Sequence, residues 1–171
     1  VISFGEEISP DTFAFVNRVC KALFEHPFTG FIEAVPAYAC VTVFYDLAAV
    51  TSGKLNIGLY LSDLVAGIDD VNVEPPKGRL IEVPVCYDFP FGPDLRSLAA
   101  AKNISEHELV QLHTGREYLV YMMGFLPGFG YMGTLDPRLA APRKNSPEHK
   151  ITEGSVAVAG LQTSVYPMDS P

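Results

Sequence analysis

The sequence lacks tryptophan and holds only three cysteines, Cys20, Cys40 and Cys86, in its 171 residues. An odd and widely spaced set of cysteines argues against a disulfide framework and favours a reducing compartment. No CxxC pair or cluster of cysteine and histidine suggests zinc, so no metal site is predicted. No apolar run approaches the ~20 residues of a membrane span, and no signal peptide is visible. We therefore expect a cytoplasmic protein without a membrane partner.

Positive charge is also scarce, with 12 lysines and arginines against 20 acidic residues. The imbalance lies in residues 1–112, which hold 15 acidic and 7 basic side chains, whereas residues 113–171 hold 5 of each. An acidic surface repels nucleic acid and anionic membranes, so neither is an expected partner. The neutral C-terminal part leaves its arginines available for an anionic ligand.

Several nucleotide and hydrolase motifs are missing. There is no GxSxG elbow, no Walker A loop and no Gly/Ser-rich amidase signature. Residues 128–133 do match GxGxxG, but that fingerprint requires a helix directly afterwards to hold a pyrophosphate. Pro137 and Pro142 interrupt the stretch that follows. We therefore reject a dinucleotide site and interpret the stretch as a shaped loop.

The first part of the chain predicts a small α/β sandwich over residues 1–75. Ser9 is a candidate N-cap with Pro10 at the first helical position, and the apolar spacing after it is helical as far as Pro27. Strands are predicted over 31–38 and 39–45, and a second helix over 54–68. The polar, proline-rich stretch 69–78 predicts the boundary between two domains.

The second domain is expected to span residues 79–171. A strand is predicted over 80–87, and Asp94 is a candidate cap for a short helix that runs through Ala101. Ser105 and Glu108 fit a capping box for a further helix that ends near Gly115. After that helix the pattern predicts only strands and loops.

The most distinctive stretch begins with an apolar run, 118–123, that leads into a loop rich in glycine, proline and aromatic residues. With the segments that follow, it resembles the family that contains the B subunit of 5-oxoprolinase and the Kip-type inhibitors of a sporulation histidine kinase. That family is also labelled allophanate hydrolase subunit 1 and corresponds to carboxyltransferase subdomains C and D. The matching residues include Gly124, Phe125, Pro127, Gly128, Phe129, Tyr131, Gly133, 135–140, Pro142, Arg143, 154–156, Ala159, Gly160, Gln162, Thr163, Tyr166, Pro167, Ser170 and Pro171.

The resemblance implies an α+β protein, in which the N-terminal α/β sandwich is followed by a cyclophilin-like β-barrel. The family pattern continues past Ser170-Pro171, so the barrel's C-terminal strands are expected to be missing from this chain. Gly130 stands where the family usually has proline, which suggests a softer loop.

The resemblance also implies a function as the B subunit of an ATP-dependent 5-oxoprolinase, which opens 5-oxo-L-proline to L-glutamate. Expected partners are a KipA-like C subunit, in a B–C heterodimer or heterotetramer, and the hydrolase of the complex, its A subunit. ATP with magnesium is expected at the level of the complex, and the chain alone should be inactive. Alternatives are a Kip-type inhibitor that binds a histidine kinase and, more weakly, a subunit related to urea carboxylase or allophanate hydrolase.

Three residues are candidate catalytic groups. His113 could move a proton, although it could equally satisfy carbonyl groups at the end of its helix. Arg143 could bind a carboxylate or phosphate, or lie in a solvated basic turn. Gln162 could bond a lactam, or the protein's own backbone.

Further residues are assigned to binding and to loop shape. Candidate substrate or phosphate contacts are Lys144, Thr163 and Tyr166. The shaped loop is represented by Phe125, Pro127, Gly128 and Phe129, of which the aromatic rings are expected to pack and hold the loop.

Overall fold

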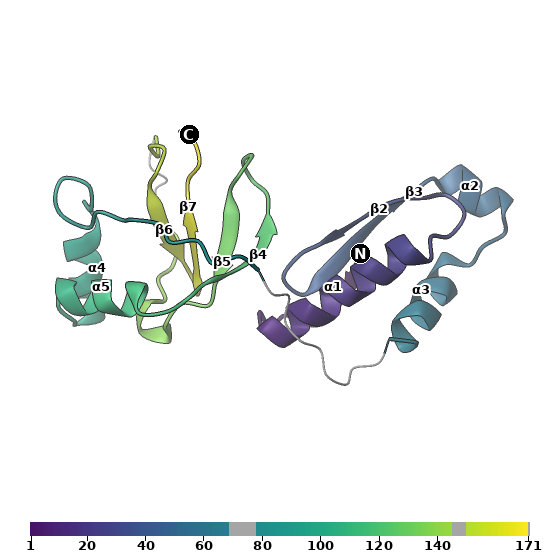
Figure 1. Ribbon diagram of the computed structural model, residues 1–171, viewed down its shortest axis with the longest axis horizontal. Helices are drawn as coiled ribbons and strands as arrows, with labels where there is room; N and C mark the ends of the chain where they lie inside the picture. Colours follow the sequence, from purple (N-terminus) through teal and green to yellow (C-terminus); the bar gives the residue numbers. More distant parts are fainter. Residues whose placement is uncertain (69–77, 145–149, 171) are drawn as a thin grey trace. The chain divides into compact units, whose positions relative to one another are not determined.

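The computed structural model describes residues 1–68, 78–144 and 150–170, which divide into two units, Val1–Gly78 and Arg79–Pro171 (Figure 1). Helices and strands occur in both units, so the α+β class is confirmed. Of the predicted boundary over 69–78, residues 69–77 lie outside the described residues. Each unit has its own hydrophobic core, built from different elements.

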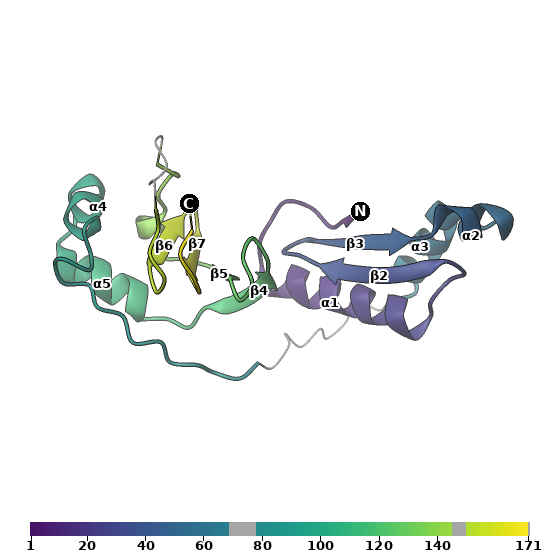
Figure 2. The ribbon, with the colours of Figure 1, turned by 90° about the horizontal axis from the view of Figure 1, so that it is seen from above.

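The first unit is a three-stranded antiparallel sheet with helices. Its elements are β1 (Ile2–Ser3), α1 (Pro10–Glu25), β2 (Phe31–Pro36), β3 (Cys40–Tyr45), α2 (Leu47–Ser52) and α3 (Ile57–Ala66). The strand order is β1-β3-β2, and α1 lies along one face of the sheet (Figure 2). The predicted helix cap is confirmed, because the Ser9 hydroxyl accepts a hydrogen bond from the Thr12 amide at 3.1 Å.

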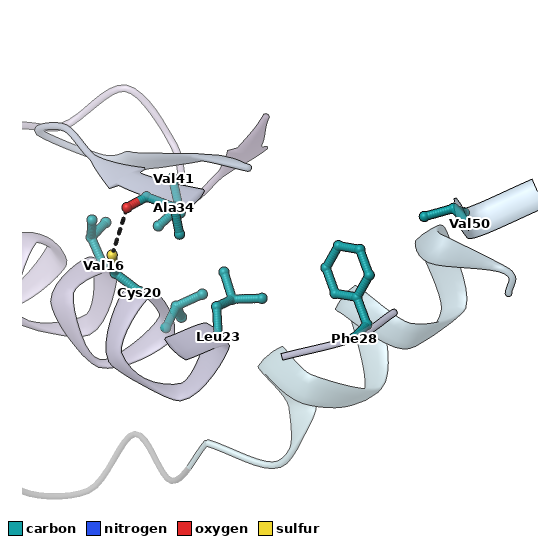
Figure 3. Packing of buried hydrophobic residues seen from close by; sticks show 8 residues of the cluster. Val16, Cys20, Leu23, Phe28, Ala34, Val41 and Val50 are labelled. Atoms are coloured by element: carbon teal, nitrogen blue, oxygen red, sulfur yellow. Dashed lines mark hydrogen bonds between the residues drawn. The ribbon is translucent and has the colours of Figure 1, made fainter. Parts of the chain in front are cut away.

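The core of this unit is apolar and fully enclosed. Val16, Val19 and Leu23 of α1 are completely buried. Figure 3 shows Leu23 and Cys20 on the side of α1 that faces Ala34 and Val41 of the sheet. The Cys20 thiol donates to the Ala34 carbonyl at 3.4 Å, so even the sulfur in this core has a partner.

The prediction of the second helix in this unit needed correction. The helix expected over 54–68 is shorter, and α2 precedes it. The reason is capping: the Asp46 carboxylate accepts hydrogen bonds from the Ala48 and Ala49 amides, and the Asn56 side chain accepts one from the Leu59 amide. Between the helices Lys54 has a positive φ of 54°, which breaks helical continuity.

The second unit combines a helix pair with a four-stranded antiparallel sheet of order β4-β5-β7-β6. Its elements are α4 (Leu95–Lys102), α5 (Glu106–Thr114), β4 (Leu119–Met123), β5 (Gly130–Gly133), the 3-10 helix η1 (Pro137–Leu139), β6 (Val156–Ala159) and β7 (Gln162–Val165). Both predicted helices are confirmed, and the Ser105 hydroxyl caps α5 by accepting from the Glu108 amide at 3.1 Å. The expected cap of α4 is wrong, because the Asp94 side chain makes no capping hydrogen bond and instead pairs with Lys144.

A small core joins the helices to the sheet. It consists of Ala99 of α4, Leu109 of α5, and Leu135 and Leu139 around η1. Val158 of β6 packs against it, so one face of the sheet is turned toward α5.

The strand predicted over 80–87 is wrong: these residues form no strand. Leu80, Ile81 and Val83 are exposed. A strand is defined by a hydrogen-bonded neighbour, and no strand among the described residues pairs with this segment. The described sheet is likewise open, since β4 and β6 are its two edges, so the cyclophilin-like barrel stays a prediction.

Candidate functional site

The most distinctive polar feature of the second unit is a buried histidine that bonds to two other segments. His113, near the end of α5, is only 8% exposed. Its Nδ1 lies 2.6 Å from the Tyr87 hydroxyl oxygen, and its Nε2 lies 3.0 Å from Thr163 Oγ1 on β7. The Tyr118 hydroxyl donates to the His113 carbonyl at 2.6 Å. The imidazole therefore ties α5 to β7 and to the segment before Asp88.

The hydrogen bonds of Thr163 determine which ring nitrogen carries the proton. Thr163 donates its only hydroxyl proton to the Ala157 carbonyl at 3.1 Å. Its oxygen must then accept from His113, so Nε2 bears a hydrogen. Burial lowers the pKa of His113, which favours the neutral ring. Nδ1 is then the acceptor for the Tyr87 hydroxyl, whose own pKa is raised by burial.

An open groove of about 790 Å³ lies beside this cluster. One wall is the extended segment 84–88, and the other comes from the two helices, with Leu95 of α4 and Glu106, His107 and Val110 of α5. Tyr87 belongs to the wall, so the same residue lines the groove and contacts His113. The carboxylates of Asp88 and Glu106 make the lining partly acidic.

Lys144 meets the start of α4 next to this groove. Its Nζ lies 2.8 Å from Asp94 Oδ2, and Asp94 immediately precedes the groove residue Leu95. A cation predicted to bind phosphate or carboxylate therefore lies at the border of the groove. Arg143 is exposed on the same loop, and no hydrogen bond or ion pair joins it to His113 within the described part of the chain.

The other predicted site residues are placed apart from the cluster. Successive strand residues point to opposite faces, and Thr163 faces His113. Gln162 accordingly lies on the opposite face of β7, and the structure does not bring it to His113. Of the predicted set, it brings together His113 and Thr163, with Lys144 near the adjoining groove.

Tyr166 belongs to an aromatic cluster around the shaped loop. Its ring centroid lies 5.1 Å from that of Phe129 and 6.3 Å from that of Phe125. Phe129 is buried, whereas Phe125 is exposed and has a φ of 64°. Gly128 has a φ of 86°, and a Cβ there would lie 3.3 Å from Pro167. Strand β5 follows this loop instead of a helix, which agrees with rejection of a dinucleotide site.

Sequence reasoning missed two features of this unit. The pattern over 80–87 predicts only a strand and indicates no role for Tyr87. Asp136 and Arg138 form a paired carboxylate and guanidinium, with Nε 3.0 Å from Oδ1 and Nη2 3.1 Å from Oδ2. The Arg138 hydrogen bonds lower the pKa of Asp136 to about 2. The spacing Asp-Pro-Arg, with an acid at the N-cap of η1, is the signal that could have identified this pair.

The described residues support neither a metal site nor a membrane-spanning helix. No group of three or more histidine, cysteine or acidic side chains among residues 1–68, 78–144 and 150–170 could hold a metal ion. Over the same residues, the longest helices fall short of the length and apolar character that a membrane crossing requires.

Comparison with known proteins places the chain in a family. The model of the carboxyltransferase domain, subdomain C and D, matches residues 1–171. A Bacillus subtilis protein, named as the B subunit of 5-oxoprolinase, is 41% identical over 183 aligned positions, covering 100% of this chain and 74% of the relative. An Escherichia coli O157:H7 protein of the same name is 45% identical over 56% of this chain and 44% of the relative.

Solved structures agree with this assignment. The crystal structure of TTHA0988 superposes with a TM-score of 0.77 and 34% identity, over 99% of this chain but only 32% of that protein. The urea amidolyase of K. lactis shares the fold at a TM-score of 0.66, with 15% identity over 97% of this chain and 11% of that one. The sequence thus corresponds to a part of larger polypeptides in both cases.

Proposed function

The chain belongs to the family of the carboxyltransferase domain, subdomain C and D, and we propose that it acts as the B subunit of an ATP-dependent 5-oxoprolinase complex. The observation that carries this proposal is 41% identity along the whole chain to a relative that is named as the B subunit of 5-oxoprolinase. A protein named as a subunit has partner chains. The partners proposed for this chain are a C-type subunit, paired as a heterodimer or heterotetramer, and an A-type hydrolase subunit.

The chemistry of the proposed substrate explains the need for ATP. Amide resonance stabilises the lactam of 5-oxo-L-proline against attack by water. Attack of the lactam oxygen on the γ-phosphorus of ATP releases ADP and turns that oxygen into part of a leaving group. The lactam nitrogen loses its proton in the same step, because a C=N bond replaces the C–N bond. A base near the lactam is therefore required.

The site residues are proposed to divide these tasks. His113 is neutral and can accept a proton, and Lys144 offers a positive charge beside the groove. Arg143 would contact phosphate or the substrate carboxylate, whereas Gln162, on the other face of β7 from His113, is given no role at the lactam. Thr163 is hydrogen-bonded to His113 Nε2. The Tyr166 ring packs against Phe129 of the shaped loop. Magnesium–ATP is proposed to bind at the level of the assembled complex.

We also propose that the four-stranded sheet belongs to a cyclophilin-like barrel. Support comes from its two edges, β4 and β6, which have no further partner strand among the described residues. The exposed segment 80–87 has the apolar composition of a strand and is a suitable pairing edge. Closure would place more backbone next to the groove.

Reconstitution tests the proposed function. The protein is combined with the A-type and C-type subunits, and glutamate release from 5-oxo-L-proline is measured with and without ATP. We expect release that requires ATP and all three types of chain. Lys144→Ala should lower the rate at least tenfold, whereas Lys21→Ala, which removes an exposed lysine paired with Glu25 on α1, should leave it unchanged. Glutamate release that persists without this chain would refute the proposal.

A histidine kinase is the alternative partner. A complex without 5-oxoprolinase activity, together with direct binding to a sensor kinase, would favour the Kip-type inhibitor. Carboxylation or hydrolysis of urea-derived substrates would instead favour the third possibility, for which the likeness to urea amidolyase supports the fold alone.

A further inference from the structure

His113 is poorly placed to touch a ligand directly. It is buried, and both of its ring nitrogens are already hydrogen-bonded. Tyr87, by contrast, lines the open groove and bonds to Nδ1 through its hydroxyl group. A ligand in the groove therefore meets Tyr87 before it meets His113.

We propose that Tyr87 is a further catalytic residue, which takes a proton from a ligand in the groove and passes its own hydroxyl proton to His113 Nδ1. This inference rests on the proposed function, and it assigns the groove of 84–88, α4 and α5 to the amide part of the substrate. This arrangement suits a ligand whose N–H group becomes more acidic during the reaction, as the lactam N–H does when its oxygen is phosphorylated.

The proton transfer balances without another reactant. The lactam N–H bond breaks as its proton moves to the Tyr87 oxygen, and the original Tyr87 O–H bond breaks as that proton moves to Nδ1. The electron pair left on the lactam nitrogen forms the C=N bond while the lactam oxygen bonds to phosphorus. Tyr87 ends as a neutral phenol, and His113 ends as an imidazolium. The reverse transfer returns the proton when the ring opens and the nitrogen becomes an amine.

Thr163 is a positioning residue in this scheme. Because its hydroxyl donates to the Ala157 carbonyl, it can only accept from Nε2–H. That bond keeps the proton of neutral His113 on Nε2 and leaves Nδ1 as an acceptor toward Tyr87. A serine at this position would preserve the bond, and a valine would abolish it.

Other ionisable groups surround the pair. Tyr118 lies against the imidazole with ring centroids 5.5 Å apart, and burial raises the pKa of its hydroxyl group. The groove contributes Cys86 and Asp88 from the extended segment and Glu106 and His107 from α5. Burial lowers the pKa of His113, so the ring is neutral before the transfer and Nδ1 is free to take the proton.

Kinetics of the reconstituted complex test this assignment. Tyr87→Phe should lower kcat roughly 100-fold or more, within the range of general acid–base catalysis, and change KM less than about threefold. His113→Asn should have a similar effect, and the double variant should be little worse, because residues that act as a unit are non-additive. Tyr118→Phe is the matched control, since it removes another hydroxyl bonded to His113, and we expect less than a threefold change.

A spectroscopic readout separates catalysis from structural support. Nitrogen-15 NMR of His113 should show an Nε2–H tautomer in the wild type. Thr163→Val should shift the population toward Nδ1–H, and Thr163→Ser should restore the wild-type signal. An Nδ1–H tautomer in the wild type would overturn the relay.

The kinetic outcomes distinguish the two levels of the proposal. An active complex with unchanged kcat in Tyr87→Phe would overturn the role of Tyr87 while the proposed function stands. A loss of kcat in Tyr118→Phe equal to that in Tyr87→Phe would also overturn it, because general loosening around His113 would then suffice. A wild-type complex without 5-oxoprolinase activity would overturn both proposals.

Discussion

The two units differ in what fills their interiors. The core of Val1–Gly78 contains apolar side chains from α1 and the sheet, and its one buried thiol bonds to a carbonyl. The unit Arg79–Pro171 has a smaller apolar core and adds a buried chain of Tyr87, His113 and Thr163. Apolar side chains cannot move a proton, whereas buried polar groups are costly unless they are hydrogen-bonded. The proposed proton transfer therefore belongs to the second unit, whereas the first unit offers mainly apolar packing.

The largest stability effect should come from the apolar core. Leu23 has 0% exposure on α1 and its neighbour Phe24 has 54%. Leu23→Ala should cost the first unit about 2–5 kcal/mol, because it removes buried methyl groups and leaves a cavity. Phe24→Ala is the control and should cost much less. Urea unfolding monitored by hydrogen exchange in each unit measures both, and equal losses would break the contrast between core and surface.

The buried polar chain should show a smaller effect that depends on hydrogen bonding. Thr163→Val keeps the shape but leaves the Nε2–H group of His113 without an acceptor, at a cost of about 1–3 kcal/mol. Thr163→Ser keeps the hydroxyl group and should recover most of that loss. The measurement is urea unfolding of the second unit. Equal stability of the two variants would contradict a dominant role for the hydroxyl group.

The buried residues Tyr87, His113 and Thr163 should also make the second unit sensitive to acid. Burial lowers the folded-state pKa of His113, so the unfolded chain binds its proton more readily. Stability contributed by the neutral ring is present above the unfolded value of about 6.5 and is lost as the pH falls below it. His113→Asn should flatten this dependence between about pH 7 and 5, whereas His107→Asn, exposed on α5, should not. Unfolding curves at several pH values provide the test, and parallel curves for wild type and His113→Asn would contradict it.

The smallest effect is expected at the ion pair of Asp136 and the exposed Arg138. The folded-state pKa of Asp136 is about 2, well below the ordinary value. Its contribution is present above about pH 4 and disappears as the pH falls toward 2. Asp136→Asn should therefore reduce stability at pH 6 but not at pH 2. Thermal unfolding at pH 6 and pH 2 measures this effect, with Asp94→Asn as the comparison variant. A loss of stability in Asp136→Asn that persists at pH 2 would argue against the carboxylate charge as its cause.

Local signals predicted much of the fold. Ser9 and Ser105 identified helix starts because an N-cap is set by a few neighbouring residues. The segment 80–87 failed for the opposite reason. Apolar composition predicts an extended backbone, but a strand also requires a partner elsewhere in the chain, and composition does not reveal one.

The sequence pointed to two residues of the buried cluster but not to their arrangement. His113 and Thr163 were both identified, although their bond joins positions 50 residues apart. Gln162 was grouped with them, yet strand alternation places it on the other face. Tyr87 escaped notice because nothing near it in the sequence indicates a contact with His113. Tertiary contacts decide which candidates meet, and these contacts lie beyond short-range pattern.

The most direct test of the account is ATP-dependent glutamate release by the complex containing either wild-type chain or Tyr87→Phe. We predict that the wild type supports turnover of 5-oxo-L-proline and that the variant assembles normally but loses most of kcat at an almost unchanged KM. Turnover by the variant at the wild-type rate would contradict the claim that Tyr87 and His113 move a proton during the reaction.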